Sequence, residues 1–202
     1  MNIMKQTYEI LSIPNDLLKT LESIGRTCYK SEDKITNDSA SKFVKLLIDK
    51  KHHAMIEFGD IIVKFITNRG VTHELVRHRI CSFAQESTRY VNYGGKDIFF
   101  IQPVWWDEST EHQKNIWSCA MSFAEEFYQD LISSGWQPQQ AREVLPNSLK
   151  TEIIIKANIR EWRHIFNLRC DKSAHPQMRA LMIPLLEELK SKLPVVFDNI
   201  IY

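Results

Sequence analysis

The sequence is poor in the residues that divide a chain into separate parts. Its 202 residues include only six Gly and seven Pro, and no Gly-, Pro- or Ser-rich stretch marks a flexible linker. No internal repeat or low-complexity segment is present. With 44% hydrophobic residues, a chain of this length can bury a sizeable core. We therefore predict one domain over residues 1–202.

Paired cysteines and long apolar runs are also missing. Cys28, Cys81, Cys119 and Cys170 stand alone, so no CxxC pair supports a zinc ribbon or a thioredoxin-like motif. No apolar run approaches the roughly 20 residues of a membrane span, and residues 1–8 contain no apolar signal region. We expect a cytoplasmic protein in a reducing setting, without a membrane partner.

The charges nearly cancel. The net charge is +1, so no global field favours a nucleic-acid polymer or an anionic membrane surface. A local arginine cluster can still bind a single phosphate. The Gly-rich P-loop and the GxGxxG motif are both absent, which removes the two common nucleotide-binding signatures. No HxxxH or HExxH spacing occurs, and we expect no metal.

Hydrophobic periodicity predicts a few strands among several helices. The segments 58–67 and 149–157 are rich in β-branched residues and indicate two long strands, and 5–12 indicates a short one. Helices are predicted over 17–24, 38–51, 71–79, 109–133, 138–146, 161–168 and 176–193. No βαβ rhythm is present. We predict an α+β fold with a central, mainly antiparallel sheet flanked by helices, in a single domain with a helical elaboration.

Polar residues concentrate over positions 74–90. Arg77, His78, Arg79 and Arg89 lie at the end of a predicted helix and in the extended segment that follows. Arginine binds phosphates and carbonyl oxygens with two parallel hydrogen bonds, and Ser and Thr hydroxyls can complete a phosphate cradle. A solvated basic face has the same composition. The spacing alone leaves both interpretations open.

The same segment resembles the flavin-dependent thymidylate synthases. Their hallmark is Arg-His-Arg, seven further residues and Ser, here Arg77-His78-Arg79 and Ser87. Upstream, His52 and Glu57 resemble a His-x-x-x-x-Glu block that precedes a strand. Downstream, the stretch from Arg142 to Pro146 resembles Arg-x-x-Leu-Pro, and Asn158-x-Arg160 and Asn167-Leu168-Arg169 follow in the family's order. The resemblance covers about residues 50–180.

This resemblance implies an activity. The enzyme would be an FAD-dependent methyltransferase of dTMP biosynthesis that methylates dUMP. Methylenetetrahydrofolate would supply the carbon, and NADPH would supply electrons through FAD. The resemblance also implies a homotetramer with active sites shared between subunits.

The resemblance further implies site residues. Catalytic roles fall to Arg169, Ser87 and His52. The expected dUMP contacts are Glu74, Arg77, Gln85, Glu86, Ser87, Thr88, Arg89, Arg142 and Arg169. The expected FAD contacts are His52, Arg77, His78, Arg79, Ile80, Asn158, Arg160 and His164. Of two neighbouring histidines, His52 rather than His53 matches the family's position.

Several alternatives stay open at this level. Glu74, Ala84 and Gln85 depart from residues that many members carry, so a degenerate member that keeps FAD but lacks turnover is one alternative. Ser87 as a nucleophile needs an adjacent base, which the sequence does not place. Cys81 is a second candidate nucleophile, although small buried cysteines are common. A non-catalytic nucleotide- or RNA-binding module that uses the cluster from Arg77 to Arg89 is the alternative of a different class.

Overall fold

The computed structural model describes all residues, 1–202. In chain order, the elements are β1 (Asn2–Met4), β2 (Thr7–Ser12), α1 (Leu17–Tyr29), η1 (Glu32–Lys34), α2 (Ser39–Asp49), η2 (His53–Phe58), β3 (Asp60–Asn68), α3 (Arg69–Leu75), β4 (Ser82–Gln85), β5 (Phe99–Ile101), α4 (Glu111–Ser133), α5 (Pro138–Ala141), η3 (Arg142–Val144), β6 (Lys150–Asn158), α6 (Ile159–Arg169) and α7 (Pro176–Lys192). None of the helices combines the length and the apolar character that crossing a bilayer requires.

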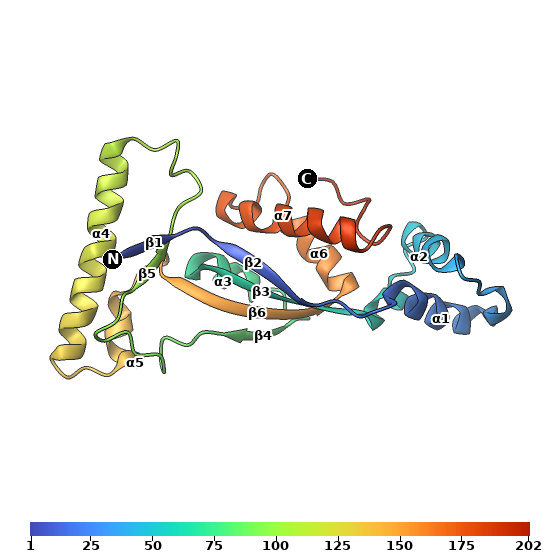
Figure 1. Cartoon of the computed structure of the whole chain (residues 1–202), viewed down its shortest axis with the longest axis horizontal. Helices are drawn as coiled ribbons and strands as arrows, with labels where there is room; N and C mark the ends of the chain where they lie inside the picture. The colour runs from blue at the N-terminus through green and yellow to red at the C-terminus, as the bar shows by residue number, and fades with distance from the viewer. The chain divides into compact units, whose positions relative to one another are not determined.

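Two sheets are present (Figure 1). The larger one has the strand order β2-β3-β6-β4 and is mainly antiparallel. The smaller one pairs β1 with β5 in parallel, with Ile3 opposite Phe100. This arrangement confirms the predicted α+β class and the mainly antiparallel central sheet. The short strand β1 was not predicted, since three residues are too few for a recognisable pattern.

The two long strands were predicted from their β-branched residues and are confirmed. Along β3, buried and half-exposed residues alternate strictly, with Ile61, Val63 and Phe65 fully buried. Such an alternation has the period of two that a strand imposes on its side chains. In β6, Ile153 and Ile155 are buried in the same way.

The chain divides into two compact units. The first unit consists of Met1–Thr7, Phe65–Arg77 and Phe83–Ile154, and the second of Tyr8–Lys64, His78–Ser82 and Ile155–Tyr202. The chain therefore passes from the first unit to the second between Arg77 and His78, inside the Arg-His-Arg motif. That the whole chain acts as one domain stays a prediction.

The core of the first unit forms around β5 and α4. The buried residues Ile98, Phe100, Met121, Tyr128 and Leu149 make one cluster. Helix α4 starts where Thr110 and Gln113 form a capping box, in which each side chain accepts a hydrogen bond from the other residue's backbone N–H. The helix ends just before Gly135, which has a φ of 98°. These bounds are close to the predicted 109–133.

The core of the second unit forms around α6 and α7. Trp162 stacks on Phe166, whose ring meets Phe197 edge-on, and all three are fully buried. The indole Nε1–H of Trp162 donates to the backbone oxygen of Ile61 over 3.0 Å, which ties α6 to β3. In α1, a Cβ at Gly25 would lie 2.5 Å from the ring of Phe43 in α2, so only glycine allows this approach.

Helix α3 differs from its predicted range of 71–79. It begins earlier because the Asn68 side chain accepts a hydrogen bond from the backbone N–H of Val71 over 2.8 Å and caps it. It ends at Leu75, so Glu74 lies on the helix, whereas Arg77 and His78 lie in the turn beyond it. This turn lets His78 be buried while Arg77 and Arg79 on either side stay exposed.

Candidate functional site

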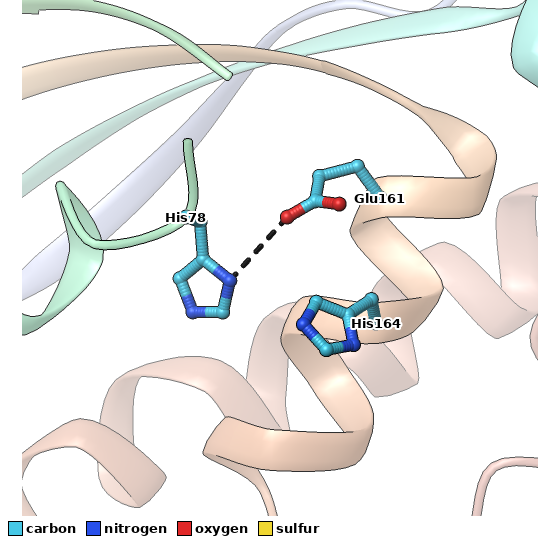
Figure 2. A group of neighbouring side chains, drawn as sticks. All are labelled: His78, Glu161 and His164. Atoms are coloured by element: carbon cyan, nitrogen blue, oxygen red, sulfur yellow. Dashed lines mark ion pairs between the residues drawn. The ribbon is translucent and has the colours of Figure 1, made fainter. Parts of the chain in front are cut away.

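A buried polar centre lies in the second unit, where the segment 78–82 meets α6 (Figure 2). His78 is 5% exposed and Glu161 is 7% exposed. The Nε–H of Arg169 donates to Nε2 of His78 over 3.0 Å. On the other side of the ring, Nδ1 of His78 lies 3.4 Å from a carboxylate oxygen of Glu161. The centre thus joins the Arg-His-Arg motif to the Asn167-Leu168-Arg169 block.

The hydrogen bond from Arg169 decides the protonation of His78. An arginine N–H only donates, so Nε2 must present its lone pair and the ring proton must sit at Nδ1. The pKa of His78 is lowered to about 4, first by burial and then by the positive charges of Arg169 and His164. The ring is therefore neutral at pH 7. Burial raises the pKa of Glu161, while the nearby His164 and Arg160 act in the opposite direction.

Helix α6 supplies most of this centre. Its N-cap is Asn158, whose Oδ1 accepts the backbone N–H of Glu161 over 2.9 Å. Glu161 and His164 are three residues apart, so one helix face carries both, and Figure 2 shows both side chains beside His78. The rings of His78 and His164 meet edge-on, with 5.6 Å between centroids.

The ligand atoms of His78, Glu161 and His164 lie within 4.8 Å of one another, close enough to share a metal ion. The hydrogen bonds of His78 argue against metal binding. The Nε2 lone pair of His78 accepts from Arg169, and Nδ1 carries the proton. A guanidinium at hydrogen-bond distance would also repel a cation. Sequence spacing did not reveal this convergence, and the absence of a metal stays a prediction.

A cavity of about 550 Å³ opens beside this centre, entirely within the second unit. Its lining residues are His53, Glu57, Ile80, Asn158, Arg160, Glu161, Arg163, His164 and Asn167. Four of the predicted FAD contacts are among them, namely Ile80, Asn158, Arg160 and His164. The other four, His52, Arg77, His78 and Arg79, do not line it, whereas His53, which the family resemblance ranked below His52, does.

The cavity's residues fit a flavin. Its volume lies in the range of small-molecule sites, roughly 300–1,000 Å³. Ile80 is 72% exposed and offers an apolar surface on which a planar ring can pack. Arg160, His164 and Asn167 can donate to carbonyl or phosphate oxygens. Arg160 is held by Glu57, with 2.5 Å between Nη1 and the carboxylate oxygen. The Oδ1 of Asn158 caps α6, which leaves its amide nitrogen as the group that would face a ligand.

His52 lines a neighbouring cavity of about 360 Å³, together with Tyr29 and Met55. The hydroxyl of Tyr29 lies 2.7 Å from Nδ1 of His52, and the two rings stack with an interplanar angle of 19°. Tyr29 was not predicted as a site residue. Its position at the end of α1, far from His52 in sequence, gives no signal of this contact.

In the first unit, the predicted nucleotide residues at the end of β4 and just beyond it form a second polar group. Gln85 donates from Nε2 to the hydroxyls of Thr72 and Thr151, over 2.9 and 3.3 Å. Glu86 accepts from the hydroxyl of Tyr93 over 2.7 Å and from Nζ of Lys150 over 3.2 Å. Both residues are thereby held in place by neighbouring elements.

The remaining nucleotide residues of this unit are more open. The backbone N–H of Arg89 donates to Oγ of Ser87 over 3.3 Å, and the Arg89 side chain donates from Nε to Gln139 over 3.2 Å. Arg142 is exposed at the start of η3 and pairs with Glu143 at 3.6 Å. Thr88 is buried. No base contacts the hydroxyl of Ser87 in the described hydrogen bonds, which gives no support to a nucleophilic serine.

Cys81 does not have the character of a nucleophile. Burial, with the carboxylate of Glu161 nearby, raises the pKa of its thiol to about 12. At pH 7 to 8 almost none of it is the reactive thiolate. Burial likewise raises the pKa of Cys170 to about 12. Cys28 and Cys119 are exposed, and Cys28 lines the cavity of Tyr29 and His52.

Comparison with known proteins decides the family. The model of the thymidylate synthase complementing protein family matches residues 9–195. The flavin-dependent thymidylate synthase of Geobacter sulfurreducens is 31% identical over 182 residues, which cover 87% of this chain and 78% of the relative. That of Mycobacterium avium is 32% identical over 198 residues, which cover 89% and 78%. This chain belongs to the flavin-dependent thymidylate synthase family.

The fold agrees with this membership. The crystal structure of a UMP/dUMP methylase from Streptomyces cacaoi superposes with a TM-score of 0.82 at 23% identity and covers 98% of this chain and 96% of that one. As a member of the family, the chain is a flavin-dependent methyltransferase. Membership thus decides between the enzyme and the RNA-binding module that the basic cluster left open.

Proposed function

We propose that this protein methylates dUMP to dTMP, with 5,10-methylenetetrahydrofolate as carbon donor and NADPH as reductant through FAD. The transferred carbon arrives as a methylene and leaves as a methyl, so it needs two electrons. NADPH supplies them, and the folate is released as tetrahydrofolate. When bound, the flavin supplies the two-electron chemistry between these partners.

The observation that carries this proposal is the contact of Arg169 with His78 beside the cavity. Arg169 provides a fixed positive charge and planar donors. We assign it to the uracil, where it stabilises negative charge that develops as the ring is reduced. His78 holds the guanidinium through the hydrogen bond at Nε, and its own ring is neutral at pH 7.

The flavin is assigned to the 550 Å³ cavity, with Ile80 against the ring and with Asn158, Arg160 and His164 as polar contacts. His53 joins this set because it lines the same wall. His52, Arg77, His78 and Arg79 keep their predicted roles as further flavin contacts. His52 is also assigned to the folate, oriented by Tyr29.

The nucleotide's phosphate and sugar have their own assigned contacts. Arg77, Ser87, Arg89 and Arg142 are the assigned contacts, all but Ser87 cationic and exposed. Glu74, Gln85, Glu86 and Thr88 complete the assigned set. The solved methylase of Streptomyces cacaoi was crystallised with 5-bromo-dUMP, which supports a pyrimidine nucleotide as the ligand of this fold.

A homotetramer with shared active sites is part of the proposal. Exposed aromatic residues support self-association, since Phe123 and Phe127 on α4 are 55% and 53% exposed and stack on each other. Light scattering coupled to size exclusion measures the mass directly. A monomer at micromolar concentration would contradict this part and leave the chemistry untouched.

The test of the proposed function starts with the purified protein. Flavin absorbance should accompany the protein, and dTMP should form only with dUMP, methylenetetrahydrofolate and NADPH all present. Omission of each in turn is the internal control, and UMP in place of dUMP measures the choice of sugar. Bound flavin without dTMP formation would identify a degenerate member and refute the proposal.

A further inference from the structure

Glu161 has no assigned role, although it is a buried acidic residue, 7% exposed. Burying a carboxylate is costly unless polar partners compensate. Its neighbours are His78 at 3.4 Å, with His164 and Arg160 as the charges that favour its ionised form. We propose that Glu161 is a positioning residue, which acts through the ring of His78 to orient the guanidinium of Arg169.

The argument rests on the two ring nitrogens of His78. In the tautomer protonated at Nδ1, the N–H dipole faces the carboxylate of Glu161, and Nε2 accepts from Arg169. In the other tautomer, an N–H at Nε2 would face the Nε–H of Arg169, donor against donor, and the Nδ1 lone pair would face a carboxylate. Both neighbours therefore favour the same tautomer, one from each side.

The consequence reaches Arg169. A hydrogen bond through Nε fixes rotation about the bond from Cδ to Nε, and this sets the plane of the guanidinium. Without Glu161, the Nδ1–H tautomer loses its electrostatic support, and Arg169 loses a dependable acceptor. The inference rests on the proposed function, because the orientation of Arg169 affects the rate only if Arg169 acts on the substrate.

Glu161→Gln is the central variant. It keeps the shape and removes the charge, and its amide can point an N–H at Nδ1, which favours the wrong tautomer. We expect kcat to fall on the order of tenfold, the value of one hydrogen bond to a charged group. We expect kcat and kcat/KM to fall together, since the lost interaction belongs to the transition state. Rates are compared per bound flavin, because Glu161 lines the cavity assigned to the flavin, and Glu161→Asp, which retains the charge, should recover most of the rate.

The spectroscopic readout is the protonation of His78. Nitrogen-15 NMR of protein labelled in its histidines distinguishes Nδ1–H from Nε2–H, and the His78→Gln spectrum assigns the signal. The wild type should show Nδ1–H, and Glu161→Gln should shift toward Nε2–H. If Glu161 only stabilised the fold, its substitution by Gln would leave the His78 nitrogen-15 signal unchanged. The matched control is Glu22→Gln, another carboxylate buried in the second unit, which pairs with Arg26 at 3.0 Å. It should lower stability without changing kcat.

Two results would overturn the inference. One is an Nε2–H tautomer of His78 in the wild type, a result that does not depend on the folding of Glu161→Gln. The other is a folded Glu161→Gln protein with wild-type kcat. In either case, dTMP formation by the wild type would leave the proposed function standing. Conversely, a wild type that forms no dTMP but shows the tautomer shift in Glu161→Gln would refute the function and confirm only the electrostatic link.

Discussion

The hydroxyl of Tyr29 lies 2.7 Å from Nδ1 of His52, and the two rings stack on each other. Tyr29 ends α1 and His52 precedes η2, so two separate segments of the second unit meet here. The phenol donates when Nδ1 is unprotonated, which places the imidazole proton at Nε2. Tyr29 thus orients a histidine that the family resemblance assigns to catalysis.

Tyr29→Phe should weaken that orientation. The ring stack remains, while the hydrogen bond is lost, a net effect of about 0.5–1.5 kcal/mol. We expect kcat/KM for methylenetetrahydrofolate to fall by about two- to tenfold, with dUMP affinity unchanged. Steady-state dTMP formation, with each substrate varied in turn, measures kcat/KM for the folate and the KM for dUMP. Tyr202→Phe removes a comparable hydrogen bond, from Tyr202 to Glu187, and should have no effect. Equal losses in the two variants would refute a role for Tyr29.

Arg169→Ala should lower the rate of dTMP formation about a hundredfold while flavin remains bound. The loss of one charge-stabilising donor costs on the order of 3 kcal/mol in the transition state, or about a hundredfold in rate. Arg169→Lys should also be slow, because a lysine ammonium lacks the planar fork. The control is Arg179→Ala, since Arg179 likewise donates through Nε, to the backbone of Cys170 over 3.1 Å. Rapid turnover by Arg169→Ala would remove Arg169 from the mechanism.

The four thiols should separate into two classes under iodoacetamide at pH 8. Cys28 and Cys119 are exposed and should react quickly. Cys81 and Cys170 should react slowly, since burial raises the pKa of each thiol to about 12. Peptide mass spectrometry gives the four rates. Fast labelling of Cys81 together with loss of activity in Cys81→Ala would revive the cysteine nucleophile.

His78 should make the folded state less stable in acid. Its pKa is lowered to about 4 from an ordinary value of 6.5. Between these values the unfolded chain binds a proton at this position and the folded protein does not, so the free energy of unfolding falls as the pH decreases from 6.5 to about 4. Urea unfolding at pH 7.5 and at pH 4.5 measures this fall in the free energy of unfolding.

His78→Gln is the comparison for that measurement. Glu161, whose raised pKa acts with the opposite sign, titrates in both proteins, so their difference reports His78. The wild type's free energy of unfolding should exceed that of His78→Gln by less at pH 4.5 than at pH 7.5. A difference that does not change with pH would contradict the lowered pKa.

Local elements could be predicted from the sequence because their signals are local. Thr110 and Gln113 start α4 and Gly135 follows its end, as capping chemistry requires. The alternation along β3 follows from the pleat of a strand. The start of α3 was predicted at residue 71, but the helix begins at Arg69. The prediction was late because Asn68, which caps the helix, was interpreted as the break that ends the strand.

The sequence by itself determined the family, because three motif blocks in the right order identify it without any geometry. Only the tertiary structure showed that Arg169 donates to His78, 91 positions away, and that Glu161 lies on the far side of the ring. The three-residue spacing of Glu161 and His164 puts them on one helix face, but it does not predict that this face contacts His78. Such contacts depend on how α6 packs against the segment 78–82, and no local pattern of residues encodes that packing.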